Sequence, residues 1–383
     1  MEKWLRSESV SKLADALLPV FAALAALAVG ALMLLVLGAN PFEAFGALLD
    51  GAFGSANSLA DTVVKATPLL LIGLGICISF RGNVINIGGE GQMIIGALLA
   101  TALGLAFPDW PGIVMIPLAM LAGFVGGAFW GGIPGALKAY FNVNEILSTI
   151  MMNAIAVQLM NFLLSGPMID PVQAAKASQI PQTARLSTSF DLPRLIPTRL
   201  HLGAGIAVLL AILVYILLWR TTIGYRIRAV GQNRFASRYA GIDVKRQIVL
   251  ALLLSGAFAG LAGAIQGFGI NHRMITDGSA TGFTGNAGFN GIVAALFGQL
   301  NPIGTIPAAF FFGALLVGAN KLQRVMQVPS ALITTINGLV VVFVVSSEKW
   351  RKTREQKRLT DMMAEIDGDP PPNPEKAVKE VGS

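Results

Sequence analysis

Polar side chains gather in one short stretch of an otherwise apolar part of the chain, Phe80–Met93, which reads FRGNVINIGGEGQM. Amides and a carboxylate offer hydrogen-bond donors and acceptors to a polar solute, and no nucleophile–base pair of the kind that covalent catalysis needs accompanies them. Glycines break the helical pattern at the same place. The residues predicted to line a solute pathway here are Asn83, Asn86, Glu90 and Gln92.

Two interpretations of this break remain open. Apolar runs flank it at Thr67–Ser79 and Ile94–Phe107. A broken helix with polar groups inside a membrane is tolerated where it lines an enclosed or watery cavity, and such helices build substrate sites in transporters. Alternatively, the stretch is a short cytoplasmic turn with Arg81 at the lipid headgroups. The first interpretation is favoured because the polar run continues into the next helix.

Three more amides extend the candidate pathway. Asn153 and Gln158 lie in the apolar run 146–164, where they serve either as interhelical hydrogen-bonding groups or as pathway lining. Asn290 ends a second stretch rich in glycine and polar residues, Gly269–Asn290. We predict no catalytic residue and no metal site, because two histidines and the single Cys77 are too few. No phosphate-binding loop of the G-x-x-x-x-G-K-[ST] form occurs either.

Composition places the chain in a membrane. Of its 383 residues 54% are hydrophobic and 13% are charged, against about 25% charged in soluble domains. The net charge of +7 does not indicate nucleic-acid binding, because the basic residues cluster beside apolar runs, where they orient spans.

The expected fold is all-α, a polytopic membrane protein of about ten transmembrane helices with a broken or re-entrant pair. We expect a cytoplasmic segment at 1–16, a transmembrane domain at 17–347, and a tail at 348–383 that is basic and then disordered. The eighth span is too short to cross alone. The expected spans are 17–37, 67–81, 91–107, 113–137, 146–164, 201–219, 248–268, 291–300, 303–320 and 331–345.

Ten spans put both termini in the cytoplasm. The segment Arg220–Arg246 has seven basic residues and one acid, which predicts a cytoplasmic position, and the long loop Ser165–Leu200 then lies outside. The fourth span is rich in glycine, which favours close helix packing. Asn142, three residues before Glu145, is predicted to cap the fifth span.

The two glycine-rich breaks resemble each other. The first continues as GGEGQMIIGALL and the second as GFNGIVAALFG. Five spans separate them, and an odd number inverts the second copy in the membrane. The pattern therefore predicts an inverted repeat.

A short cytoplasmic helix is expected at Gly231–Gly241. Asn233 suits its N-cap and Gly241 the left-handed position after its end. Two pairs share faces, Phe235 with Tyr239 and Arg234 with Arg238. The helix lies either on lipid headgroups or against a partner protein, and the partner is favoured because so short a helix needs added stabilisation.

Three motifs in order carry a family resemblance. FRGNVINIGGEGQMIIGA, NEILSTIMMNAIA and TTIGYRIRAVGQNRFASRYAGI resemble bacterial ABC-importer permeases of the ribose/branched-chain-amino-acid type, and within them the nucleoside subgroup. The resemblance covers most of Asp61–Val345. It implies a multi-pass subunit in the bacterial inner (plasma) membrane that imports nucleosides delivered by an extracytoplasmic binding lipoprotein.

The resemblance also implies partners. This chain would hold no cofactor, because a separate ATP-binding cassette ATPase binds the ATP, and a second homologous permease would complete a heterodimer. The short cytoplasmic helix matches the coupling helix that docks on the ATPase. The residues carried over to that role are Asn233, Arg234, Phe235, Arg238, Tyr239 and Gly241.

Three other functions are alternatives to a nucleoside importer subunit. A simple-sugar ABC permease differs in substrate only. An ion-coupled carrier acting alone should carry ionisable residues in several spans, whereas only Arg81 and Glu90 qualify here. An integral membrane enzyme is disfavoured because no acid–base or nucleophile constellation is visible.

Overall fold

The computed structural model describes residues 21, 24–36, 38–327, 335, 338, 339, 342, 343 and 346. Within these residues the chain is helical, with two isolated β-bridges and no β-strand, which confirms the all-α prediction. The segment 1–16 and the tail 348–383 lie outside the described residues, as does most of the expected span 331–345. The expected division into segments therefore stays a prediction.

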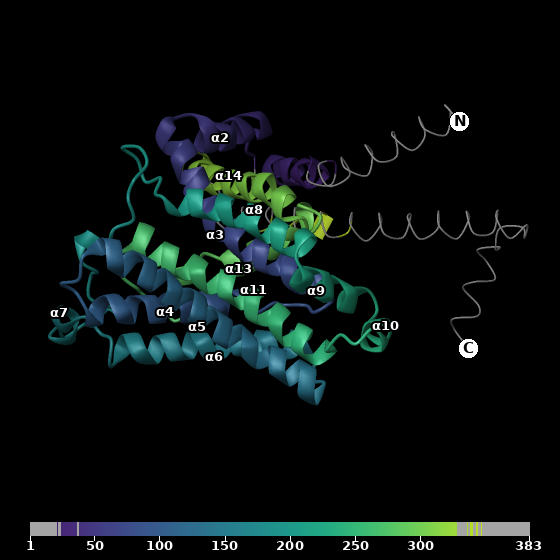
Figure 1. The fold of residues 1–383 in the computed structure, drawn as a ribbon. Helices are drawn as coiled ribbons and strands as arrows, with labels where there is room; N and C mark the ends of the chain where they lie inside the picture. Colours follow the sequence, from purple (N-terminus) through teal and green to yellow (C-terminus); the bar gives the residue numbers. More distant parts are fainter. Residues whose placement is uncertain are drawn as a thin grey trace, which may run out of the picture. The chain divides into compact units, whose positions relative to one another are not determined.

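Helices follow one another through residues 42–327 (Figure 1). Two short ones, η1 (3₁₀) and η2 (π), are not α-helices. The elements are α2 Pro41–Phe53, α3 Ala56–Arg81, α4 Gly89–Ala106, α5 Gly112–Phe141, α6 Glu145–Ser165, α7 Pro171–Ala174, η1 Thr188–Phe190, α8 Gly203–Arg220, α9 Thr222–Gln232, α10 Arg234–Tyr239, α11 Val244–Gln266, η2 Gly267–Asn271, α12 Thr281–Thr284, α13 Ala287–Phe297 and α14 Pro302–Met326.

Among the described residues, seven helices are long and apolar enough to cross a membrane: α3, α4, α5, α6, α8, α11 (continued by η2) and α14. They correspond to the second to seventh and the ninth expected spans. The eighth corresponds to α13, whose 11 residues are as short as expected. An apolar helix at Leu24–Val36 falls within the first expected span. The count of ten stays a prediction.

One helix extends beyond its expected span, and one predicted helix cap is wrong. The second span was expected from Thr67, but α3 begins at Ala56, where Ser55 caps it. Its 26 residues span about 39 Å, more than the ~30 Å hydrocarbon core, so its polar first turns need not lie in lipid. The cap of α6 is Asn144, not Asn142. Asn142 instead takes the left-handed conformation (φ 54°) that ends α5.

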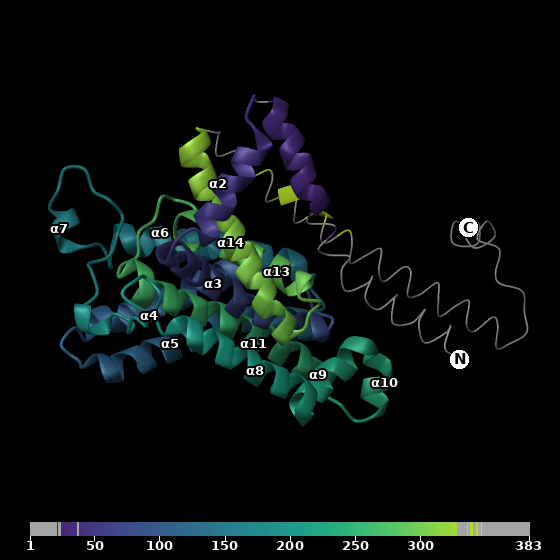
Figure 2. The same ribbon diagram turned by 90° about the horizontal axis from the view of Figure 1, so that it is seen from above.

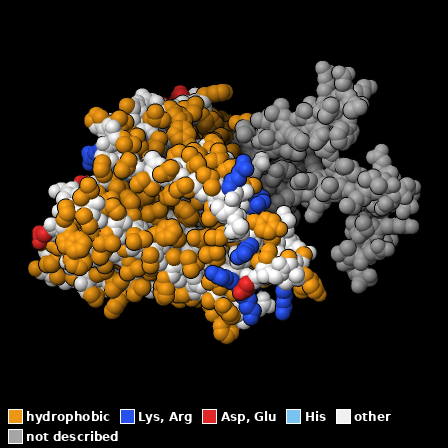
Figure 3. Space-filling model, in the orientation of Figure 1, with side chains coloured by type: hydrophobic (Ala, Val, Ile, Leu, Met, Phe, Trp, Pro, Cys, Tyr) orange, Lys and Arg blue, Asp and Glu red, His pale blue; other side chains and the backbone are white. Residues whose placement is uncertain are grey.

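The most buried helices are α3 and α11. α11 packs against α5, α4 and α3, and α3 packs against α14, α13 and α8 (Figures 1 and 2). The outer faces of α5, α6 and α8 are largely exposed and apolar. Figure 3 shows this broad hydrophobic surface, and it shows Lys and Arg side chains gathered near α9 and α10. The distribution fits a chain surrounded by lipid.

Glycines bring α11 into direct backbone contact with α5 and α4. A Cβ atom on Gly260 of α11 would lie 2.2 Å from the carbonyl oxygen of Gly123 in α5. One on Gly96 of α4 would lie 2.3 Å from the Cα atom of Gly260. No side chain fits at these crossings, which confirms the close-packing role expected for the glycines of the fourth span.

The 166–200 loop is ordered, because its backbone pairs with the segment that follows α11. The long loop expected from the sequence at 165–200 therefore has a defined position against the helices. Three loop N–H groups donate to carbonyl oxygens of that segment: Thr183 to Met274 (2.9 Å), Leu186 to His272 (2.8 Å) and Leu192 to Phe268 (3.2 Å).

His201 fixes the end of this loop to α8. The side chain is buried, and its Nδ1 accepts a hydrogen bond from the N–H of Gly203 at 3.2 Å. Burial, and then the nearby His272, lower the pKa of His201 to about 4. The imidazole is therefore neutral near pH 7, which leaves Nδ1 able to accept this bond.

We predict opposite effects of alanine at two helical glycines. Gly260→Ala should lower the free energy of unfolding by about 1–3 kcal/mol, because its methyl group meets backbone atoms. Gly205→Ala in α8 is the matched control, since no atom lies within 4 Å of its Cβ position. It should be neutral or stabilise by up to ~1 kcal/mol. Thermal unfolding in detergent measures both, and equal effects would contradict the close packing.

Candidate functional site

The connection between α3 and α4, residues 82–88, is held by side chains in place of helical hydrogen bonds. Asn86 and Gln92 are both buried and exchange two bonds, Asn86 Nδ2 to Gln92 Oε1 (2.9 Å) and Gln92 Nε2 to Asn86 Oδ1 (3.1 Å). Asn86 also donates to Ser255 Oγ of α11 at 2.8 Å and accepts from the N–H of Gly88 at 2.8 Å. The two amides thus bind the break to α11.

Asn153 of α6 holds the same connection from another side. Its Oδ1 accepts from the N–H of Gly91 at 2.8 Å, and its Nδ2 donates to the carbonyl oxygen of Ile87 at 2.9 Å. The hydroxyl of Thr149, one turn earlier on α6, accepts from the N–H of Ile87 at 3.4 Å. Two α6 side chains therefore satisfy three backbone groups at the break.

Glu90 joins the first turn of α4 to the start of α13. Its Oε1 accepts from the N–H groups of Gly288 (2.8 Å) and Phe289 (3.3 Å). These N–H groups form the positive end of the α13 dipole, which favours a carboxylate there. A helix N-terminus thus supplies hydrogen-bond donors to the buried carboxyl group of Glu90.

The two similar glycine-rich segments meet at this contact. A Cβ atom on Gly288 would lie 2.5 Å from the backbone nitrogen of Glu90. The segment 88–91 therefore packs directly on the segment 288–291, although 200 positions separate them in the sequence.

Arg81 is bound within the protein. Its Nε donates to the carbonyl oxygen of Leu300 at 3.2 Å and its Nη2 to that of Gln299 at 3.3 Å. The guanidinium also lies 5.3 Å from the centre of the Trp219 ring. These contacts tie the end of α3 to the residues that follow α13.

The structure brings some predicted pathway residues together and leaves others apart. Asn86, Glu90, Gln92 and Asn153 surround the first turn of α4. Gln158 is exposed on α6 and Asn290 is half-buried in α13. Asn83 is exposed and borders a separate pocket of about 510 Å³ beside α10.

Sequence reasoning missed Ser255 and Thr149, which complete the network around the break. Each is a hydroxyl residue within a membrane-spanning helix. Serine and threonine are common in membrane helices, because their hydroxyl groups bond to the backbone of their own helix. Their presence alone therefore does not identify a contact with another helix.

The predicted cap and left-handed end of α10 are confirmed, but the helix is shorter than expected, Arg234–Tyr239, because Gly231 belongs to α9. Asn233 caps it, with Oδ1 accepting from the N–H groups of Phe235 (2.9 Å) and Ala236 (3.0 Å). Gly241 follows its end in the left-handed conformation (φ 78°). Phe235 and Tyr239 are 81% and 94% exposed. Two adjacent aromatic side chains this exposed form a surface suited to a partner.

Comparison with known proteins identifies the family. A family model described as "Branched-chain amino acid transport system / permease component" matches residues 58–345. The guanosine ABC transporter permease protein NupP of Bacillus subtilis is 38% identical over 88% of this chain and 95% of its own length. The glucose ABC transporter permease protein TsgB13 of Haloferax volcanii is 34% identical, over 88% of each chain.

The nucleoside ABC transporter permease protein NupB of Lactococcus lactis is 31% identical over 87% of this chain and 92% of its own length. Bacillus subtilis and Lactococcus lactis each have a second similar permease, the guanosine ABC transporter permease protein NupQ and the nucleoside ABC transporter permease protein NupC, respectively. No solved structure matches the chain. The match over residues 58–345 shows that this multi-pass membrane protein belongs to the family of branched-chain amino acid transport system permease components.

Proposed function

We propose that this chain is the permease subunit of an ATP-binding cassette importer that moves nucleosides across the bacterial inner membrane. The observation that carries the proposal is the similarity, over most of the chain, to permeases named for guanosine and nucleoside transport. A simple-sugar substrate is the second candidate, supported by the similarity to a glucose permease. Nucleosides are favoured because the guanosine permease shares the higher identity.

Three partners complete the proposed importer. A separate ATPase binds and hydrolyses ATP, and this chain itself holds no cofactor. A second, homologous permease forms a heterodimer with it, which the paired relatives in two bacteria support. An extracytoplasmic binding lipoprotein delivers the substrate. The exposed apolar faces of α5, α6 and α8 leave room for both lipid and the second permease.

The pathway is proposed to pass the first turn of α4. Amides and a carboxylate there suit the hydroxyl groups of a ribose and the polar edge of a base. Asn86, Glu90 and Gln92 shape this region through their bonds to one another and to neighbouring helices. Gln158 and Asn290, which are more exposed, offer free amide groups for direct contact.

An inverted repeat, ten spans and cytoplasmic termini complete the proposed topology. The contact between segments 88–91 and 288–291 supports the repeat, since equivalent breaks meet at one place in such transporters. α7, in the 166–200 loop, and α10 lie at opposite ends of the helical bundle of residues 42–327 (Figures 1 and 2). That separation supports opposite sides of the membrane for these two segments.

The topology predicts the sidedness of two exposed glutamines. Cys77 is the only cysteine and is buried, so its replacement gives a clean background. In intact cells, an impermeant thiol reagent should label Gln179→Cys in the 166–200 loop and leave Gln232→Cys in α9 unlabelled. Labelling of Gln232→Cys alone would overturn the orientation.

Replacing Glu90 by Gln should reduce transport while the protein stays folded. The amide keeps an acceptor oxygen but loses the charge that faces α13, and a hydrogen bond to a charged group contributes about 1.5–3 kcal/mol, or at least about tenfold in rate. Uptake of labelled guanosine and of labelled glucose in a deletion strain, complemented with each variant, measures the effect and identifies the substrate class.

Stability must be measured beside uptake, because loss of the helix-dipole interaction alone costs about 0.3–1 kcal/mol. Normal uptake by both Glu90→Gln and Asn86→Ala would reject the pathway assignment. Uptake of glucose without guanosine would reject the nucleoside assignment.

Removing the two exposed aromatic side chains of α10 should detach or uncouple the ATPase. In the variant Phe235→Ala with Tyr239→Ala, the membrane helices should stay folded, because neither side chain packs on them. Copurification with the ATPase and transport in proteoliposomes measure the two effects. If the variant retains its ATPase and transports at the normal rate, α10 is not the docking helix.

A further inference from the structure

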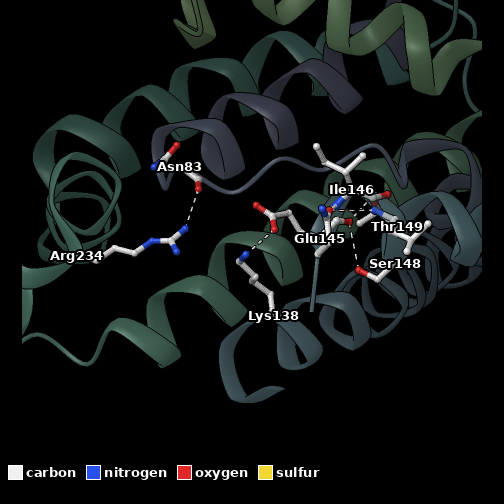
Figure 4. A network of polar contacts seen from close by, with 9 residues as sticks. Asn83, Lys138, Glu145, Ile146, Ser148, Thr149 and Arg234 are labelled. Carbon is white, nitrogen blue, oxygen red and sulfur yellow. Dashed lines mark hydrogen bonds and ion pairs between the residues drawn. The ribbon is translucent and has the colours of Figure 1, made fainter. Parts of the chain in front are cut away.

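Arg234, in the first turn of α10, joins that helix to the break between α3 and α4. Its Nη2 donates to the carbonyl oxygen of Asn83 at 3.1 Å, across 151 positions of sequence (Figure 4). Asn83 has a left-handed backbone (φ 53°) at the start of the 82–88 connection. The bond therefore reaches the backbone of the polar break and not one of its side chains.

The corner between α9 and α10 rests on the same part of the chain. A Cβ atom on Gly231 would lie 2.0 Å from the carbonyl oxygen of Arg81, so backbone meets backbone there. Val230, just before it, shares a buried apolar cluster with Val84. Because the corner touches residues 81–84 directly, a displacement of α10 cannot leave this connection unaffected.

An open pocket lies beside the first turn of α10. It has a volume of about 510 Å³ and is bordered by Asn83, Ile85, Glu145 and the segment 230–235. Across it, the carboxylate of Glu145 is held by Lys138 at 2.8 Å (Figure 4). On this side of α10, Arg234 is the side chain that extends from the helix to the 82–88 connection.

We propose that Arg234 is a positioning residue that passes the displacement of α10 to the 82–88 connection. From Asn83 the connection runs to Asn86 and then to Glu90, which holds the start of α13. A pull on the Asn83 carbonyl group thus reaches the first turns of both α4 and α13. The inference rests on the proposed function, in which α10 docks on the ATPase.

The experiment uses the complete importer in proteoliposomes and measures nucleoside transported per ATP hydrolysed. Arg234→Ala should retain the ATPase but lose about tenfold in this ratio, because it removes a hydrogen bond from a charged donor. Arg234→Lys should recover part of the ratio, since its ammonium group keeps a donor. Arg226→Ala on α9 is the matched control, an exposed arginine of the same basic segment, and should leave the ratio unchanged.

A normal ratio in Arg234→Ala would overturn the inference, and so would loss of the ATPase from that variant, since Arg234 would then serve docking. A lysine variant as impaired as the alanine variant would overturn the hydrogen-bond basis. The docking proposal has its own test. It is contradicted if the ATPase stays bound and transport stays normal in the variant Phe235→Ala with Tyr239→Ala.

Discussion

Buried backbone groups need hydrogen-bond partners, and this requirement governs the structure around the α3–α4 break. A helix satisfies them internally, but the 82–88 connection does not. Asn86 supplies a partner from within the connection, and Asn153 and Thr149 supply partners from α6. The break is stable because these side chains replace the missing helical hydrogen bonds. α6 and α11 must therefore lie close enough to α4 for the bonds to form.

Close helix packing and the polar network depend on each other. Ser255, which accepts from Asn86, directly precedes Gly256, where the backbone of α11 touches that of α5. A bulkier residue at that crossing would move α11 away and lengthen the Asn86–Ser255 bond. Small residues thus contribute to the polar site at a distance, by setting the spacing at which short side chains can reach one another.

Local signals in the sequence predicted local structure well. The cap of α10, its left-handed end and the apolar helices follow from residue types and spacing. The choice of Asn144 over Asn142 as the α6 cap did not, because both residues suit either role and the loop geometry decides. The pairing of Glu90 with Gly288 could not be predicted, since no periodic pattern reports a contact across 198 residues.

The 166–200 loop is attached to the segment after α11 by backbone atoms, and this has an evolutionary consequence. Every residue type has a main-chain carbonyl group, and every type except proline has a main-chain N–H group, so these bonds do not depend on the side chain. The outward side chains of the loop can therefore change without loss of the attachment, whereas an insertion shifts the pairing register. Such a loop can adapt its surface to new binding partners while the helices beneath it keep their positions.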